Sequence, residues 1–319
     1  MARRIHLVLR SYGGENTKGR PAYYSKLLCL LSFIRAACEV PEADVIFLND
    51  GPVPAVHLAL MERYGTVVQI PDGPIGMRGS FWPAITLPQQ HPEWPDSDIV
   101  SLNEDDYLYR PDAFAVLAEA AAQISEAGYF STYGARPDYD SPTARAQFGL
   151  PRGWKPAPDR VVEGRTWFNQ PGITSTITAR AGALRSDELV FRQCMFPFRN
   201  RFLDHESCLI NQGVVPYRGL DIVLGLPGDL VLGLRGIVRT IALIPIRLAL
   251  NLHAVARPRR HLLYCLTPNA STHLDLPVVS PDQDWLVEAH TVHQWATKQG
   301  LTAAADSIAK TLDREDRAA

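Results

Sequence analysis

The stretch Asp98-Ile-Val-Ser-Leu-Asn-Glu-Asp-Asp-Tyr-Leu-Tyr109 places an apolar run directly before three consecutive carboxylates, Glu104, Asp105 and Asp106. The run is too short for a helix and predicts a buried strand that carries the acids to the edge of a sheet. Because adjacent like charges repel and are costly to desolvate, we expect a cation to hold them, and oxygen ligands favour Mg²⁺ or Mn²⁺. The alternative is a solvated acidic turn.

Short apolar runs alternate with segments of helical periodicity before this stretch. We expect strands at residues 5–9, 44–51 and 65–70, and helices at 23–38 and 57–63. This alternation predicts an α/β fold with a mostly parallel central sheet, helices on both faces and ligands at the carboxyl ends of the strands. Ser11 and Tyr12 follow the first strand, and Asp50 closes the second.

The second half of the chain is less regular. We expect a helix at residues 113–127, strands at 129–133 and 261–265, a loop excursion at 135–160 and a hairpin within 161–179, around 174–178. Long loops in compact domains are often functional, so the excursion is a candidate acceptor-binding region.

The apolar strand, the Glu-Asp-Asp triplet, the aromatic residue after it and a helix starting near Pro111 together resemble the DxD-type metal site of GT-A fold glycosyltransferases, in particular family 2. The resemblance covers about residues 5–275. It implies a GT-A (Rossmann-like) fold with a helical C-terminal addition, and an enzyme that moves a hexosyl or pentosyl group from a UDP- or GDP-sugar to an acceptor hydroxyl. It also implies Mn²⁺ or Mg²⁺ as the cofactor.

The same resemblance implies roles for individual residues. The donor-binding candidates are Ser11, Tyr12, Asp50, Arg78, Ser80, Glu104 and Asp105, and the metal candidates are Asp106 and His273. Arg78 lies before a helix in a glycine-rich connection, where it is either a phosphate contact or a surface residue. Asn49-Asp50-Gly51 is equally typical of an ordinary turn, and His273 of an exposed loop histidine.

Asp204 and Glu206 precede a helical apolar run, so they are candidates either for N-terminal helix caps or for catalysis. In inverting GT-A enzymes an acid at this place removes the proton of the acceptor hydroxyl. The resemblance therefore implies Asp204 first and Glu206 second as the general base. If the anomeric configuration is retained, no dedicated base is needed.

Residues 219–260 are strongly apolar, but Arg235, Arg239 and Arg247 interrupt them and Pro245 is expected to kink the helix. A basic stripe on an apolar helix favours a membrane-interface helix or a contact with a partner subunit over a spanning helix. A core helix with snorkelling arginines is the alternative. This segment suggests a lipid-linked or membrane-proximal acceptor, or a homo-oligomer.

The whole chain has 319 residues, 46% of them hydrophobic, and a net charge of -2, which gives no reason to expect nucleic-acid binding. Five scattered cysteines and no visible signal peptide predict a cytoplasmic protein, with peripheral contact to the inner membrane face. We divide the chain into a catalytic core (1–218), the apolar basic segment (219–260) and a C-terminal completion of the core (261–319). The rival functions are a nucleotidyltransferase and a non-enzymatic membrane-peripheral binding protein.

Overall fold

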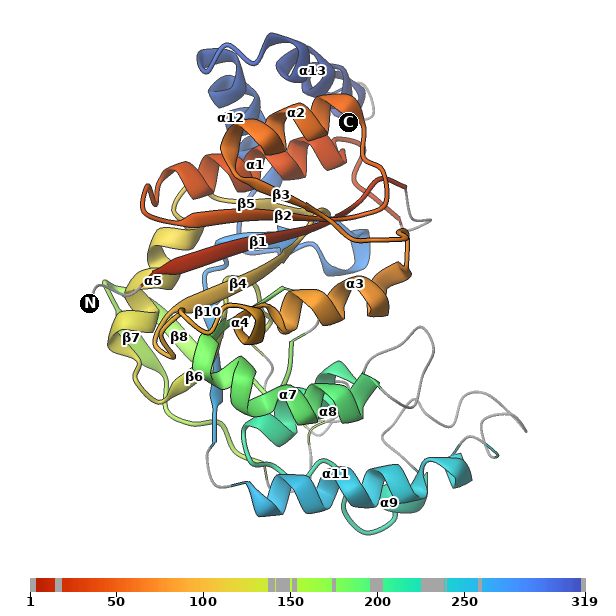
Figure 1. Ribbon diagram of the computed structural model, residues 1–319. Helices are drawn as coiled ribbons and strands as arrows, with labels where there is room; N and C mark the ends of the chain where they lie inside the picture. Colours follow the sequence, from red (N-terminus) through yellow and green to blue (C-terminus); the bar gives the residue numbers. More distant parts are fainter. Residues whose placement is uncertain are drawn as a thin grey trace.

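The computed structural model describes residues 4–14, 19–136, 141, 150, 154–173, 176–195, 203–224, 238, 240–257 and 260–316. Within these residues a nine-stranded sheet has the order β3-β2-β1-β4-β9-β6-β10-β8-β7 (Figure 1). Its strands are β1 (Ile5–Tyr12), β2 (Asp44–Asp50), β3 (Thr66–Gln69), β4 (Ile99–Glu104), β6 (Ala127–Ser131), β7 (Arg160–Val162), β8 (Arg165–Asn169), β9 (Ile177–Arg180) and β10 (Leu262–Thr267). A separate antiparallel pair consists of β5 (Tyr107–Tyr109) and β11 (Ser271–His273).

The pairing of the strands confirms the predicted α/β class with a mostly parallel sheet. β1 is parallel to β2 and β4, β2 to β3, and β6 to β10. β9 is antiparallel to both β4 and β6, so these two strands point the same way. In this register Tyr12 lies beside Asp50, and Arg10 lies beside Glu104. The carboxyl ends of β1, β2 and β4 therefore meet at one edge, where α/β sheets bind ligands.

The expected hairpin lies earlier in the chain than residues 174–178. It consists of β7 and β8, joined at Glu163-Gly164, where both residues have a positive φ of 45° and 74°. Two such residues suit the tight turn of a two-residue hairpin. Thr178 belongs instead to β9, and its hydroxyl donates to Ser101 of β4 at 2.8 Å. The alternation of threonine and apolar residues there reflects a strand inserted between two others.

Helices cover both faces of the sheet (Figure 1). One layer contains α1 (Lys26–Cys38), α2 (Ala55–Tyr64), α5 (Ala113–Gln123), α12 (Trp285–Lys298) and α13 (Thr302–Asp316), and the other contains α3 (Gly76–Ile85), α4 (Leu87–Gln90), α7 (Ala181–Met195) and α8 (Asp204–Asn211). A short 3₁₀ helix covers Leu276–Val278. α9 (Asp221–Leu224) and α11 (Ile244–Ala256) lie outside α7 and α8. α11 packs on them through Leu250 and Ala254, and Ile222 of α9 packs against the same cluster. The five cysteines are free thiols, and all but Cys38 are buried.

The apolar basic segment agrees with its prediction in one respect and differs in another. Residues 240–242 are helical, a turn at Leu243 interrupts them, and α11 begins at Ile244 with Pro245 in its first turn, so the helix is broken beside the proline as expected. Arg247 is only 2% exposed and donates to the carbonyl oxygens of Ile222, Val223 and Thr240 at 3.3–3.4 Å. It therefore joins α11 to α9 rather than facing outward. Arg235 and Arg239 lie outside the described residues.

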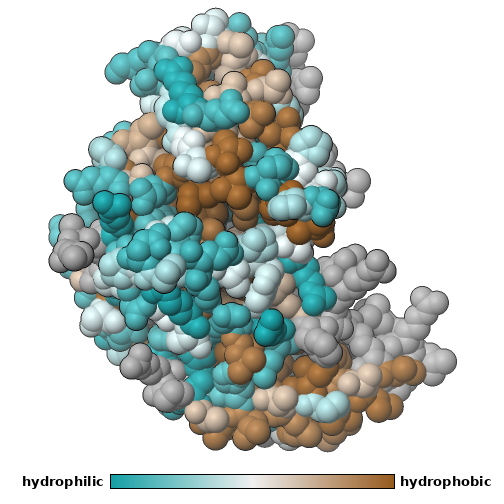
Figure 2. Space-filling view, viewed as in Figure 1, coloured by the Kyte–Doolittle hydropathy of each residue, from teal (hydrophilic) through white to brown (hydrophobic). Residues whose placement is uncertain are grey.

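The outward side of α9, of α11 and of the residues just before each helix is apolar, and we call it the apolar outer face. Its residues, each at least 40% exposed, are Leu220, Val223, Leu224, Val238, Ile241, Leu248, Leu252 and Val255. Figure 2 shows it as brown surface along the edge that these helices form. No helix in the described ranges has the length and hydropathy needed to cross a membrane.

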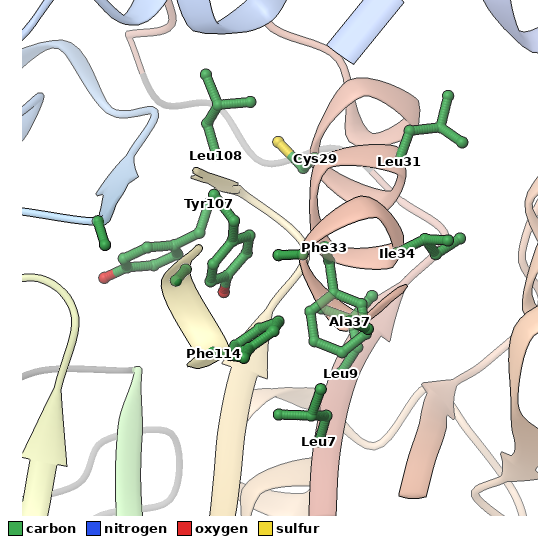
Figure 3. Packing of buried hydrophobic residues seen from close by; sticks show 14 of the residues in the cluster. Leu7, Leu9, Cys29, Leu31, Phe33, Ile34, Ala37, Tyr107, Leu108 and Phe114 are labelled. Atoms are coloured by element: carbon green, nitrogen blue, oxygen red, sulfur yellow. The ribbon is translucent and has the colours of Figure 1, made fainter. Parts of the chain in front are cut away.

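The buried core holds the acidic turn in place. In β1, Leu7 and Leu9 face α1 and pack near Phe33, whereas Val8 belongs to the cluster on the other face (Figure 3). Tyr107 and the other two residues of β5 are at most 1% exposed. Burial of a large apolar side chain contributes about 1.5–3 kcal/mol, so packing holds β5 in place. Asp105 and Asp106 therefore lie in a turn between two strands, β4 and β5, that are fixed by packing.

Candidate active site

The three carboxylates lie where β4 ends and the chain turns into β5. Glu104 is the last residue of β4, and Asp105 and Asp106 form the turn. His273 was expected in a loop, but it is the last residue of β11, and its register partner is Tyr107. Its Nε2 lies 3.0 Å from Oδ2 of Asp106, and its ring stacks on Tyr107 with centroids 4.8 Å apart. The structure thus brings the two predicted metal ligands together.

Each of the three carboxylates contacts a basic side chain from the first 26 residues of the chain. The pairs are Glu104 with Arg10, Asp105 Oδ2 with Lys26 Nζ at 2.9 Å, and Asp106 Oδ2 with Arg20 Nη2 at 2.9 Å. The chain therefore supplies its own cations to the acidic turn. Sequence reasoning did not place these three bases in the site, although any buried acid cluster has to be matched in charge.

Burial and pairing shift the ionisation of this cluster. Burial raises the pKa of Asp105, against the opposing effect of the Lys26 ammonium. Burial lowers the pKa of Arg20, but its hydrogen bond to Asp106 and the charge interactions with Tyr24, Asp106 and Cys29 together outweigh burial, and the pKa is raised overall. Arg20 also donates to the carbonyl oxygen of Leu274 at 2.6 Å, next to His273. The Arg20 guanidinium is consequently held as a cation beside the two candidate metal ligands.

The end of β1 forms one wall of the site. The Tyr12 N–H donates to Asp105 Oδ2 at 2.8 Å, and the Tyr12 carbonyl accepts from Lys26. The Tyr12 side chain is 45% exposed, with Lys26 Nζ 5.2 Å from its ring centroid. A Cβ on Gly14 would lie 2.5 Å from this ring, so any other residue there would displace the Tyr12 side chain. Ser11 is buried and donates to Asn49 Oδ1 at 2.5 Å, so it supports the strand end from beneath.

The other donor-site candidates surround the start of α3. Asp50 is 2% exposed, and its two oxygens accept the N–H groups of Ile75 at 2.7 Å and Gly76 at 3.0 Å. It therefore anchors α3 to the end of β2. Ser80 is also buried and accepts from Arg10 at 2.9 Å, whereas Arg78 is half-buried on α3. Direct donor contacts of Asp50, Arg78 and Ser80 stay predictions.

The two candidate bases differ sharply in their surroundings. Asp204 is half-buried in the first turn of α8, and its Oδ1 accepts the N–H of His205 at 2.9 Å. The N-cap is Leu203 and no side chain caps α8, so Asp204 is not the expected N-terminal cap. Glu206 is 7% exposed and accepts from the Tyr217 hydroxyl at 2.6 Å. Burial raises the pKa of Glu206, and the Tyr217 hydrogen bond opposes that shift. Their catalytic roles stay predictions.

A divalent metal fits this site only in part. Among the described residues no group of three or more His, Cys, Asp or Glu side chains forms a metal-binding cluster. Asp106 and His273 do present a carboxylate oxygen and an imidazole nitrogen to one another, which are ligands that suit Mn²⁺. Ions of this type often use one or two protein ligands and take the rest from substrate phosphates and water. The pair therefore fits a metal site that the donor completes.

Comparisons with known proteins identify similar structures but no sequence family. No protein-family model matches the chain, and no curated protein matches it in sequence. Its structure is similar to Mycobacterium tuberculosis glucosyl-3-phosphoglycerate synthase, with 15% identity over 70% of this chain and 68% of that chain and a TM-score of 0.39. It is also similar to apo mouse xyloside xylosyltransferase 1, with 14% identity over 65% and 80% and a TM-score of 0.36. TM-scores this low support neither the fold nor the chemistry, which follow from the residues and topology of this chain.

Proposed function

We propose that this protein is a glycosyltransferase that moves a sugar from a nucleotide-diphospho-sugar to an acceptor hydroxyl. The observation that supports this most is the meeting of Asp106 and His273 at the carboxyl end of β4, beside the ends of β1 and β2. A carboxylate and an imidazole at this edge, with basic side chains around them, suit a metal-bound diphosphate.

The wall at the end of β1 suits the nucleotide part of a UDP- or GDP-sugar. The exposed ring of Tyr12 offers a flat surface on which a base can stack. Asp105 and Glu104 lie next to it and can accept hydrogen bonds from ribose or sugar hydroxyls. Arg78, half-buried on α3, is the proposed phosphate contact on the opposite side.

We propose that Asp106 and His273 hold the Mn²⁺ or Mg²⁺ ion. When bound, such an ion neutralises charge that develops on the leaving diphosphate. The chain's part is to fix the two ligands: Tyr107 stacks on the imidazole, and β5 and β11 hold both residues through backbone pairing. Removal of divalent metal with a chelator should therefore stop transfer, and Mn²⁺ should restore it.

For an inverting reaction we propose Asp204 as the base that accepts the proton of the acceptor hydroxyl. Asp204 is half-buried, and only its Oδ1 is used by the His205 N–H, so Oδ2 is the proposed proton acceptor. Glu206 is enclosed with Tyr217, which suits a positioning residue. Asp204→Asn should then lower kcat by roughly 10²–10⁴-fold. Unchanged turnover in Asp204→Asn, with the anomeric configuration retained, would exclude this role.

We also propose that the apolar outer face contacts a membrane and that the acceptor is lipid-linked or membrane-proximal. Its residues on α9 and α11 lack the cover that apolar side chains of this size usually have. The exposed residues Arg218 and Arg260 flank the two helices in sequence and would favour anionic headgroups. Placed at an interface, this face would lie beside the α7 and α8 side of the sheet.

Vesicle sedimentation tests the membrane contact. Wild-type protein should sediment with anionic vesicles, and Leu252→Glu should remain in the supernatant. Val287→Glu is the matched control, because Val287 is an exposed apolar residue on α12, away from the outer face. Elution of the wild type as a homo-oligomer, without binding to vesicles, would instead assign the face to contact between copies.

Incubation with labelled nucleotide-sugars and Mn²⁺ tests the activity itself. Release of nucleoside diphosphate, by transfer to an acceptor or slowly to water, is expected. Release of pyrophosphate would favour a nucleotidyltransferase. A thermal-shift series of nucleoside diphosphates with and without Mn²⁺ identifies the base, because a ligand that binds the folded state raises the melting temperature. If no nucleotide binds and no donor is consumed, the proposal is wrong.

A further inference from the structure

Among the described residues, the charges of the acidic turn are paired before any ligand arrives. Its three carboxylates and three bases form the pairs Glu104–Arg10, Asp105–Lys26 and Asp106–Arg20. The charges of these six side chains cancel. All six side chains are at most 18% exposed, so water screens an added charge poorly. A divalent ion that enters alone would leave this part-buried site with two uncompensated positive charges.

Arg20 competes with such an ion for one oxygen of Asp106. Its Nη2 and the His273 Nε2 contact this oxygen, Oδ2, at 2.9 Å and 3.0 Å. A metal held by Asp106 Oδ2 and His273 would weaken the contact with Arg20 and would lie next to a cation. The two phosphates of a nucleotide-diphospho-sugar carry one negative charge each. Metal and donor together therefore restore the charge balance that metal alone destroys.

We propose that Arg20 is the resident counter-cation of Asp106, which opposes metal binding in the absence of donor and turns to the diphosphate when donor and metal enter together. This inference rests on the proposed function and extends it to Arg20 and to the order of binding. Guanidinium groups bind phosphate oxygens with charge-assisted hydrogen bonds, so the displaced Arg20 gains a new partner. Metal and nucleotide then strengthen one another's binding, as linkage requires.

Binding of Mn²⁺ without any nucleotide tests the role of Arg20. Free Mn²⁺ is measured by the electron paramagnetic resonance signal of the solvated ion. Arg20→Gln removes one positive charge and should bind Mn²⁺ alone roughly tenfold more tightly than the wild type, since a nearby like charge is gone. Arg20→Lys keeps the charge and should bind Mn²⁺ as weakly as the wild type. Lys26→Gln also removes a charge from the cluster and serves if Arg20→Gln does not fold.

The second measurement adds UDP or GDP. The nucleotide should increase the Mn²⁺ affinity of the wild type strongly, and this increase should be several-fold smaller in Arg20→Gln. Equal Mn²⁺ affinity in the wild type, Arg20→Gln and Lys26→Gln would overturn the inference, even if sugar transfer is observed. Tighter Mn²⁺ binding by the charge-removing variants supports it independently of which sugar is transferred, so failure of the proposed function is detected separately by the donor assay.

Discussion

Two buried aspartates have the same kinds of neighbour, an arginine and a histidine, in very different settings. Asp106 contacts Arg20 and His273 in the turn after β4. Asp187, on α7, contacts Arg257 through Oδ1 and His261 through Oδ2, with His261 Nδ1 2.9 Å from Oδ2. The side chain of Asp187 is fully buried, whereas that of Asp106 is 9% exposed.

The difference lies in what else surrounds each carboxylate. Asp187 also accepts from the Tyr129 hydroxyl at 2.7 Å, so it connects α7 to β6, to the end of α11 and to the start of β10. Asp106 lies at the carboxyl end of parallel strands, the edge where ligands bind. The comparison teaches that an Asp-Arg-His group has no function by itself. Its position relative to the sheet separates a structural anchor from a candidate ligand site.

The largest expected effect comes from Asp106→Asn. Loss of the carboxylate charge should lower kcat/KM by roughly 10²–10³-fold, a size typical of lost electrostatic stabilisation. Asn keeps the size of the side chain and can still accept from Arg20, and the Asp106–Arg20 pair is more exposed than Asp187–Arg257, so the melting temperature should fall less than in Asp187→Asn. Nucleoside diphosphate release and thermal unfolding are the two measurements. A large drop in melting temperature would make Asp106 an anchor like Asp187.

Asp187→Asn should show the reverse pattern. It leaves the buried Arg257 without its counter-charge, which typically costs about 3–5 kcal/mol. We expect the melting temperature to fall on the order of 10 °C, with kcat of the folded protein close to that of the wild type. Arg257→Met added to Asp187→Asn should cost less than the sum of the single changes. An additive double variant would show that the pair is not coupled.

The pH dependence of stability sharpens the same contrast. Burial raises the pKa of Asp187, but its hydrogen bond and charge interaction with His261, together with Arg257, outweigh burial and lower the pKa below its ordinary 3.8. A lowered pKa stabilises the folded state above pH 3.8, and this contribution is lost as the pH falls through the folded-state pKa. The difference in unfolding free energy between wild type and Asp187→Asn should therefore shrink as the pH falls below 3.8. Urea unfolding across this range measures it, and a difference that grows in acid would contradict the prediction.

Glu206→Gln should have the smallest effect, with the opposite pH trend. Glu206 is a buried acid whose pKa burial raises above 4.5, with a tyrosine hydroxyl rather than an arginine as its hydrogen-bond partner. Its neutral form favours folding below pH 4.5, and that contribution is lost as the pH rises through the folded-state pKa. The stability of Glu206→Gln relative to the wild type should therefore increase as the pH rises above 4.5. Equal pH profiles for the two proteins would show that Glu206 ionises without cost.

Much of the fold was predictable because apolar periodicity reflects burial, which is a local property of each segment. The strands at β1, β2, β3 and β10 and the helices at α1, α2 and α5 were expected within a few residues of their bounds. The hairpin was misplaced because Thr178 has the pattern of any strand flanked by two neighbours. The break beside Pro245 was predictable because a proline cannot continue the helix that precedes it, although it suits the first turn of a new one.

The sequence alone determined that an apolar strand ends in three acids and that a mostly parallel α/β sheet surrounds it, since both follow from local pattern. Only the tertiary structure decided which groups face those acids. Arg20 is 86 residues from Asp106 in the chain, and His273 is 167 residues away, yet both contact the same oxygen. Such contacts depend on strand order and register, which bring distant segments together, so no local pattern of residues encodes them.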